Sequence, residues 1–428
     1  MNKYRINAVS LVKEYYKPAI VYTAWFGLVL FLMPRQSHFL DMPTFARWAV
    51  YSFECGLGNI YQLEEVNYLP FYPYLLHLYG QLAGSVAVIY SKIYWLKAIT
   101  LLFDFIGAIV AVSFVQGTKK QFALSFWLLL NIAYLYNTLI WGQVDSIYTC
   151  FTFIAAALAL RKQPIGSLVF YVLALNTKTQ AIVFLPVLLL LWLPLWLQSA
   201  RVLPLALLAA VGLQFVLLIP FIWLGEQNYL MTMLSNHTST LFYFDVISWD
   251  SYNFWHLLAE NHPATHRNDM LMVAGLTYRS WGLLLFCLSS AVVLLPLFIL
   301  TVRNLFFRVQ ALRVEPSLVF LTCALVTICL CYFKTEMHSR YWHPAILFLA
   351  AYGFVSKRYA LLFICSVAYT LNLEAAMQFL RKDLNIFLEW NPQFNSRFIA
   401  SIYTLLLVLA VRELYSQFNF KEYLPRRV

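Results

Sequence analysis

The chain has 428 residues, of which 62% are hydrophobic and 11% are charged, whereas about 25% of the residues are charged in an ordinary soluble domain. A chain of this size cannot bury so much apolar surface in one water-soluble core, so its mean hydropathy of +0.69 indicates an integral membrane protein. The net charge of +11 does not indicate a nucleic-acid-binding protein, because no segment outside the apolar runs combines clustered Lys and Arg with aromatic residues.

The apolar residues form continuous runs, which disfavours a β-barrel and predicts membrane-spanning helices of roughly 20 residues. The first run has no small-residue cleavage site after it, so we expect it to be retained as the first span. The sequence predicts an all-α polytopic membrane protein, a single integral membrane domain over residues 1–428 with about 11–13 transmembrane helices. In chain order the expected spans are roughly 17–34, 93–115, 122–140, 145–160, 165–177, 179–197, 203–224, 281–302, 317–333, 342–356, 359–375 and 398–412.

The distribution of charge predicts an orientation. With the N-terminus inside, the loops and tails on the cytoplasmic side carry most of the 30 Lys and Arg residues and few acids, which is the positive-inside pattern. All eight histidines then fall on the other, outer side. The weakest part of this assignment is 165–197, where polar residues around Lys178 interrupt two short runs. A broken helix or a re-entrant hairpin is the alternative there.

Two outer loops are long. The first, about 35–92, contains weak helical periodicity around 43–55 and 70–90, which predicts helices that lie along the membrane surface rather than crossing it. The second, about 225–280, is rich in His, Asn, Asp and Trp.

The first candidate site residue is Asp41, about seven residues beyond the first span. A carboxylate at the mouth of a membrane cavity can act as a general base, with its pKa raised by partial desolvation. The alternative is a helix N-cap before Met42 and Pro43. Further along, Tyr72 belongs to an aromatic element with two prolines at the end of the first outer loop, which is either a rigid part of a site or an interfacial anchor.

The next candidates lie in a short outer turn. Gly142 permits a close backbone approach after Trp141, and Gln143 and Asp145 can present a hydrogen-bonding edge to a polyol. The alternative interpretation is a tight connection between two helices. Within the preceding span, Lys97 and Asp104 lie on one helical face, which predicts an ionisable pair with either a functional or a packing role.

Cationic residues form the last group. Lys178, with Gln180, lies between two apolar runs, where a lysine is costly unless it snorkels, pairs or binds an anion. The densest polar cluster contains His338 and Arg340 in an outer loop of about eight residues. A guanidinium beside an imidazole at a membrane surface is suited to a phosphate or pyrophosphate group.

Taken in order, these motifs resemble the GT-C superfamily of polyprenyl-phosphate-sugar-dependent glycosyltransferases, especially its GPI-mannosyltransferase-like and dolichyl-phosphate-glucose-dependent members. The most specific matches are the Trp-Gly-Gln-x-Asp turn and a Met-His-x-Arg-Tyr element, in which Ser339 stands where Glu is usual. Looser matches are an acid after the first span, the aromatic-proline element, a Lys-x-Gln before Leu185–Pro186 and an Asn-x-Trp element at Asn253.

The resemblance implies a GT-C-type bundle that moves a hexose, with mannose favoured, from a polyprenyl-phosphate-sugar donor to an acceptor hydroxyl with inversion. In this assignment Asp41 is the catalytic base, and Arg340, His338 and Lys178 bind the donor phosphate. Substrate-positioning roles fall to Trp141, Gln143, Asp145, Tyr72, Gln180 and Asn253. A single acid at Asp41, rather than a pair, makes a divalent metal unlikely, and we expect no cofactor or metal.

The expected partners are the lipid-linked sugar, a lipid-linked glycan or other hydroxyl acceptor, and membrane lipids, with no nucleic acid. We expect a bacterial inner membrane with a periplasmic site, or an endoplasmic reticulum membrane with a lumenal site. The alternative function is a transporter or flippase of lipid-linked glycans, although such proteins often carry inverted repeats and midplane charges. A structural membrane scaffold is a third possibility, disfavoured by the clustering of His and Arg.

Overall fold

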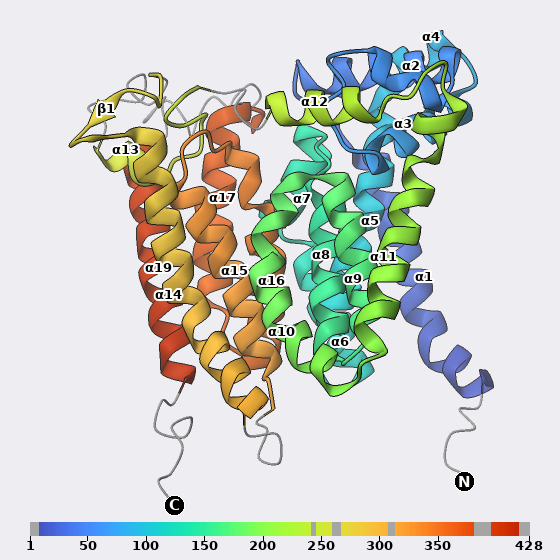
Figure 1. The fold of residues 1–428 in the computed structure, drawn as a ribbon. Helices are drawn as coiled ribbons and strands as arrows, with labels where there is room; N and C mark the ends of the chain where they lie inside the picture. Colours follow the sequence, from blue (N-terminus) through green and yellow to red (C-terminus); the bar gives the residue numbers. More distant parts are fainter. Residues whose placement is uncertain (1–7, 241–244, 259–266, 307–312, 381–394, 419–428) are drawn as a thin grey trace, which may run out of the picture.

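The computed structural model describes residues 8–240, 245–258, 267–306, 313–380 and 395–418. The structure is 79% helical. In the described ranges, the strands β1 (Met272–Val273) and β2 (Leu276–Thr277) form one short antiparallel hairpin. The long helices run side by side as one bundle (Figure 1): α1 (Ala8–Leu32), α5 (Leu96–Val112), α6 (Thr118–Leu129), α8 (Asp145–Leu160), α9 (Pro164–Thr177), α10 (Leu185–Gln198), α11 (Val202–Ile219), α14 (Tyr278–Phe306), α15 (Pro316–Phe333), α16 (His343–Ser356), α17 (Ala360–Met377) and α19 (Ser396–Gln417).

Among the described residues, seven helices are long and apolar enough to cross a membrane, and an eighth span results if α6 and the segment Ile132–Trp141 are counted as one helix bent by 60°. Tyr16–Leu32, α8 and α9 are apolar but shorter. The chain is therefore an all-α integral membrane protein that crosses the bilayer several times. The seven or eight qualifying helices are fewer than the twelve expected spans, because several helices have fewer residues than a straight crossing requires.

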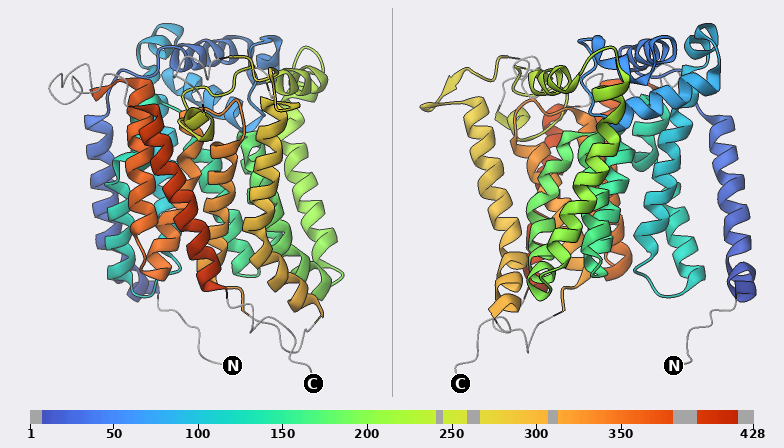
Figure 2. Two further views of the ribbon diagram at one scale, coloured as in Figure 1. Left: turned by 90° about the vertical axis from the view of Figure 1, so that its left-hand side faces the viewer. Right: turned by 45° about the vertical axis from the view of Figure 1, so that its right-hand side comes forward.

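Shorter elements cover one end of the bundle. Helices α2 (Asp41–Cys55), α3 (Phe71–Ala83) and α4 (Val86–Ser91) lie there with α12 (Leu230–Thr240) (Figures 1 and 2). Helix α2 buries a stripe that includes Met42, Phe45, Ala46 and Ala49, the spacing of an amphipathic helix. This confirms the helices expected in the first outer loop. We call this end, opposite the start of α1 and the end of α19, the polar end.

The remaining short elements connect the bundle: α7 (Ile132–Tyr136), α13 (Phe254–Leu258), π-turns at Asn137–Trp141 and Pro220–Leu224, and 3-10 turns at Leu57–Gln62, Ile93–Trp95, Thr179–Phe184 and Ser339–Trp342.

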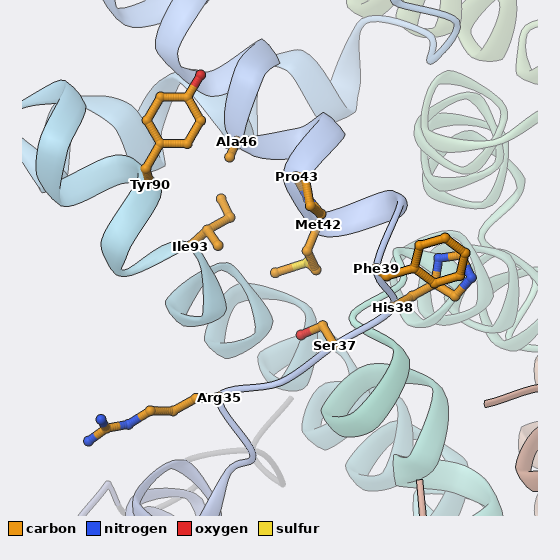
Figure 3. Close-up of a pocket in the computed structure, with 9 residues that line it drawn as sticks. All are labelled: Arg35, Ser37, His38, Phe39, Met42, Pro43, Ala46, Tyr90 and Ile93. Carbon is orange, nitrogen blue, oxygen red and sulfur yellow. The ribbon is translucent and has the colours of Figure 1, made fainter. Parts of the chain in front are cut away.

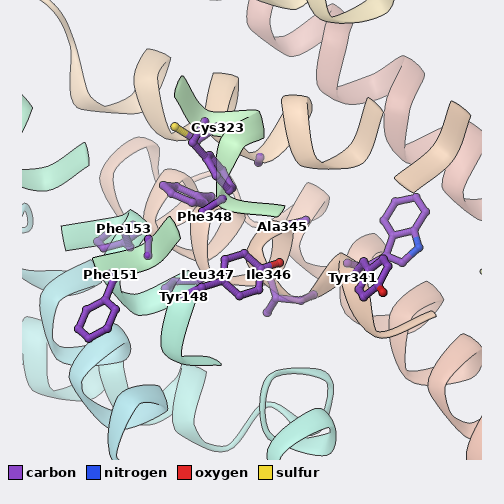
Figure 4. Packing of buried hydrophobic residues seen from close by; sticks show 14 of the residues in the cluster. Tyr148, Phe151, Phe153, Cys323, Tyr341, Ala345, Ile346, Leu347 and Phe348 are labelled. Atoms are coloured by element: carbon purple, nitrogen blue, oxygen red, sulfur yellow. The ribbon is translucent and has the colours of Figure 1, made fainter. Parts of the chain in front are cut away.

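The centre of the bundle is formed by α15 and α16. Most of α15 is buried, and α16 is buried from His343 to Phe354. The ring of Phe153 of α8 lies 5.2 Å from that of Phe320 and 5.1 Å from that of Phe348. Figure 4 shows Phe153 and Phe348 among the buried side chains. By contrast, few residues of α11 and α14 are buried within the protein, so their apolar surfaces are the ones expected to face lipid. The polar residues at the start of α16 are therefore anchored on the most enclosed helix.

Within the bundle, one expectation agrees with the structure and another is wrong. Residues 165–197 form α9, a 3-10 turn and α10, and Lys178 between them lies at the polar end, because it contacts Asp145 and the ring of Tyr341. Lys97 and Asp104 do not form the predicted ion pair: Lys97 donates to backbone carbonyls, and Asp104 lies 3.4 Å from His343. Seven residues along a helix separate two side chains by about 10 Å, too far for contact despite a shared face.

Candidate functional site

Asp41 is the first residue of α2, after a linker that leads from the end of α1 at Leu32. Leu40 occupies the N-cap position and makes no side-chain capping hydrogen bond, whereas Nδ1 of His38 accepts from the Asp41 N–H at 3.4 Å. The prediction that Asp41 is an N-cap is therefore wrong. Its carboxylate points toward other parts of the chain, and its side chain is 22% exposed.

Three side-chain nitrogens converge on one oxygen of Asp41, Oδ2. Trp141 donates its indole N–H at 2.7 Å, and Arg340 donates from Nη1 at 3.0 Å. Nδ1 of His38 also lies 3.0 Å from this oxygen. In the described part of the chain, the second oxygen, Oδ1, accepts no hydrogen bond. One carboxylate oxygen therefore holds the arrangement together, and the other is available to a ligand.

Trp141 lies at the centre of this group. Its ring stacks on His38 at a centroid distance of 5.0 Å and an interplanar angle of 17°. The ring of His338 meets it edge-on at 5.0 Å and 77°, and the Arg340 guanidinium lies 5.8 Å from its centroid. A cation over an indole face is favourable, so Trp141 fixes the relative places of the carboxylate, the guanidinium and both imidazoles.

The charge state of Asp41 differs from the expectation. Burial alone would raise the pKa of its carboxyl, but the positive charge of Arg340 and the contacts with His38 and Trp141 outweigh burial and hold the pKa well below its usual range. The prediction of a raised pKa is wrong for the protein without substrate. Desolvation alone would raise this pKa, but the cation paired with the carboxylate lowers it by more.

The backbone at Trp141 explains how two distant segments meet here. The π-turn Asn137–Trp141 ends at Gly142, whose φ is +87°. A Cβ atom at Gly142 would lie 2.8 Å from Sδ of Met42, the residue after Asp41. Glycine at this position therefore allows both the left-handed conformation and the close approach of α2.

A second ion pair lies beside the first. Lys178 contacts the Asp145 carboxylate, and both side chains are almost fully buried. Asn137 donates to the other oxygen of Asp145 at 3.0 Å. The Lys178 ammonium also lies 4.7 Å from the ring centroid of Tyr341. Burial lowers the pKa of Lys178 to about 8, although Asp145 opposes this effect.

The His338 side chain is neutral at neutral pH, because burial and the nearby Arg340 charge lower its pKa well below the usual value. A neutral imidazole still offers one N–H donor. Arg340 has a further donor: its Nε is buried and has no hydrogen-bond partner in the described ranges. A buried N–H without a partner is uncommon in native proteins, so this donor is a candidate contact for a bound anion.

Two aromatic residues, Tyr68 and Tyr72, line one side of the group. The Tyr68 hydroxyl lies 3.5 Å from Oε1 of Gln143, and its ring lies 5.1 Å from the ring of Tyr72. Burial, opposed by the charge of Arg340, raises the pKa of Tyr68. Nε2 of Gln143 and the hydroxyl of Tyr72 are buried without a partner among the described residues. Both are therefore further candidate contacts for a polar ligand.

The structure places two predicted site residues away from this group. Asn253 holds α13 in place, since its Oδ1 accepts from the Trp255 amide and its Nδ2 donates to the Cys331 carbonyl, each at 3.2 Å. Gln180 is half-buried in the turn after Lys178, and its Oε1 has no partner in the described part of the chain.

Three members of the group were missed by the sequence reasoning: His38, Tyr68 and Tyr341. His38 and Asp41 have a spacing of three residues, which is a usable signal for side chains near a helix start. Tyr68 and Tyr341 belong to motifs that were recognised, yet aromatic residues at a membrane surface are so common that their roles were not distinguished.

A cavity of about 260 Å³ lies on the other side of the α1–α2 linker. Its lining is mainly apolar: Met42 and Ile93 point into it, whereas the Arg35 guanidinium is turned away (Figure 3). His38 lies at the edge of this cavity and also contacts Asp41.

One group of carboxylates in the described ranges has the spacing of a metal site. Oxygens of Asp245, Asp269 and Glu336 lie within 4.8 Å of one another. Nη2 of Arg279 lies 2.8–2.9 Å from all three, and Lys334 pairs with Glu336 at 2.7 Å. Because two cations of the chain, Arg279 and Lys334, already pair with these carboxylates, we assign no metal to the group.

The fold and the site together define a multi-pass helical membrane protein with paired charges gathered at one end of its bundle. No protein-family model matches the chain, and no curated protein matches its sequence.

Proposed function

We propose that the protein is a membrane glycosyltransferase that moves a hexose, with mannose favoured, from a polyprenyl-phosphate-sugar donor to an acceptor hydroxyl with inversion. The polar end would face the non-cytoplasmic side. A bacterial inner membrane with a periplasmic site is favoured over an endoplasmic reticulum membrane with a lumenal site. The acceptor would be a lipid-linked glycan or another hydroxyl compound.

The contact between Asp41 and Arg340 carries this proposal. The two residues are 299 positions apart in the sequence, yet their side chains meet at 3.0 Å. A group that can take a proton thus lies beside a group that can bind phosphate. Lys178 and His338 add donors to the same region. A donor with an isoprenoid tail in the bilayer would present its phosphate at this level.

The proposed reaction is a single displacement. The acceptor oxygen attacks C1 of the sugar from the face opposite the phosphate, and its proton passes to Asp41. The bond between C1 and the phosphate oxygen breaks, and polyprenyl phosphate leaves with the electron pair. Arg340, Lys178 and the His338 N–H stabilise the negative charge that grows on the leaving phosphate.

The low pKa of Asp41 bears on this mechanism. A carboxylate paired with a guanidinium is a weak base, and a general base works best when its pKa lies near the operating pH. A donor phosphate that draws Arg340 toward itself would weaken the pair and raise the pKa of Asp41. The base would then become effective only when the donor is bound.

The decisive experiment incubates purified protein in lipid vesicles with polyprenyl-phosphate mannose, glucose or galactose and candidate acceptors, with product detection by mass spectrometry. Asp41→Asn and Arg340→Ala should each abolish transfer while expression is retained. The control is Arg47→Ala, because Arg47 lies on the same helix but pairs with Glu65 at the surface, where the two side chains are 50% and 46% exposed. Full activity in Asp41→Asn or Arg340→Ala would contradict the proposed role of that residue.

The same vesicles test the alternative. Movement of a labelled lipid-linked glycan between leaflets without any glycosyl transfer would identify a flippase and refute the proposed reaction.

A further inference from the structure

Lys97 lies in a predicted span and is 1% exposed, and the reaction proposed above does not use it. A buried lysine in a membrane segment is costly unless its charge is compensated. Its ammonium group has three N–H donors, and all three are used: Nζ lies 2.9 Å from the carbonyl oxygen of Pro34, 2.8 Å from that of Gln36 and 2.7 Å from that of Leu139.

These three carbonyls come from two separate segments. Pro34 and Gln36 belong to the linker between α1 and α2, which ends at Asp41. Leu139 belongs to the π-turn that ends at Trp141. Carbonyls near helix ends have no partner within the helix, and a lysine side chain can satisfy them. Lys97 therefore joins the segment that carries the carboxylate to the segment that carries the indole.

Other contacts at this joint bind the same two segments. The backbone N–H of His38 donates to the Trp141 carbonyl at 3.2 Å. Gly142 sits against Met42 so closely that a Cβ atom would lie 2.8 Å from the sulfur and 3.6 Å from Cε of Lys97. The linker, the turn and the Lys97 side chain thus form one packed unit, and the two segments in it end at the residues of the Asp41–Trp141 hydrogen bond.

We propose that Lys97 is a positioning residue. Its ammonium group connects the α1–α2 linker to the Trp141 turn through its three hydrogen bonds, a connection that we call the strap, and so fixes the Asp41 carboxylate against the Trp141 indole. The effect of Lys97 on sugar transfer rests on the proposed function, whereas the strap between the linker and the turn does not. Lys97 touches none of the reacting groups, so its effect on a reaction would be transmitted through the linker and the turn.

The first test measures amide hydrogen exchange by mass spectrometry on the full-length protein in detergent. In Lys97→Met, which keeps the side-chain length but removes all three donors, amides in residues 35–41 and 137–143 should exchange at least tenfold faster than in the wild type. Exchange in α15 and α16 should not change. The matched control is Thr100→Val, because Thr100 is similarly buried in α5 but its hydroxyl, the group that the substitution removes, donates to the Lys97 carbonyl in its own helix.

A second variant loosens the same joint without touching Lys97. In Gly142→Ala, the new methyl group meets Met42 and the backbone is strained at its positive φ, so the same two segments should lose protection. It keeps the test available if Lys97→Met does not fold. Unchanged exchange in residues 35–41 in a folded variant, or a uniform increase over the whole bundle, would overturn the strap.

A third measurement separates positioning from general stability. If the chain transfers sugar, Lys97→Met should lower kcat about a hundredfold, since a misplacement of about 1 Å can cost that much. The concentration of polyprenyl phosphate that half-saturates the protein should change less than threefold, because Arg340 and Lys178 lie on other elements. An unchanged kcat in a variant whose linker has loosened would refute the positioning role. If even the wild type transfers no sugar, the proposed function fails, and the exchange result still decides the strap.

Discussion

Asp41 competes with any bound anion for the positive charge of Arg340. A phosphate that binds Arg340 must share it with a carboxylate 3.0 Å away. Asp41→Asn removes that competitor, so it should bind polyprenyl phosphate about fivefold or more tightly than the wild type, a typical coupling between two sites. Binding of the lipid phosphate to the purified protein, measured by tryptophan fluorescence or calorimetry, checks this.

A double-mutant cycle identifies the route of this effect. In an Arg340→Gln background, Asp41→Asn should change the affinity little, because the shared cation is gone. An equal gain in both backgrounds would mean that the two charges act independently, through general electrostatic repulsion.

Lys178 gives the affinity a dependence on pH. Burial lowers its pKa from the usual 10.5 to about 8, while the charges of Asp145 and Asp41 oppose that of Arg340. The ammonium is charged below about pH 8 and loses its proton above that value, so the affinity for polyprenyl phosphate should fall as the pH rises from 7 to 9. Lys178→Met should remove most of this dependence, and a wild-type affinity that stays constant over this interval would refute the prediction.

The sequence predicted these residues by type and motif, but not their contacts. Asp41, Trp141 and Arg340 were each singled out, yet no periodicity relates positions that lie about 100 and 299 residues apart. The errors have physical causes. The predicted Lys97–Asp104 pair ignored the rise of the helix, and the predicted pKa of Asp41 ignored a cation supplied by the other end of the chain.

At the level of elements, the start of α14 anchors the loop that leads to His338 and Arg340. Arg279 contacts Asp245, Asp269 and Glu336, and the Asp269 side chain is fully buried. Backbone hydrogen bonds join the same two loops: Glu336 donates its N–H to the Val246 carbonyl, and Trp249 donates its N–H to the Met337 carbonyl. The long outer loop and the His338 loop are therefore held as one unit.

Arg279→Met should destabilise this unit, since it leaves the buried Asp269 carboxylate without its cation. Loss of one partner of a fully buried pair typically costs 3–5 kcal/mol. We expect about 1–3 kcal/mol, because the Arg279 side chain is 24% exposed and solvent screens part of its charge. Thermal unfolding in detergent measures this loss. Arg47→Met, at an exposed pair, should change stability by less than about 1 kcal/mol, and equal losses in the two variants would contradict the anchoring role.

Element positions were predicted better than element lengths. The surface helices around 43–55 and 70–90 correspond to α2, α3 and α4, because their amphipathic stripes are a local property of the sequence. The turn at Gly142 was predicted, but its close contact with Met42 of α2 was not, because α2 comes from a distant part of the chain. The 60° bend between α6 and the segment Ile132–Trp141 was not predicted either, because the expected span ran without interruption from 122 to 140.

For the whole molecule, the placement of Cys55 allows the predicted orientation to be tested without a reporter domain. Cys55 is exposed at the end of α2, whereas the other exposed cysteine, Cys287, lies within the apolar helix α14. If the polar end faces outward, a membrane-impermeant maleimide should label Cys55 in intact cells, and Cys55→Ser should remove that labelling. A cysteine introduced by Lys120→Cys, at an exposed position near the start of α6 at the other end, should react only after permeabilisation. The reverse pattern would invert the assigned orientation.

The meeting of Asp41 and Arg340 also sets an order of events during synthesis. At 5–20 residues per second, about 15–60 s separate the translation of two residues that are 299 positions apart. Throughout that interval the nascent chain already contains its first helices and its carboxylate, but not the guanidinium that pairs with it. A ribosome that stalls between the codons for Asp41 and Arg340 would therefore release a membrane-inserted fragment with half of a charge pair, a form that quality-control proteases could distinguish from the finished protein.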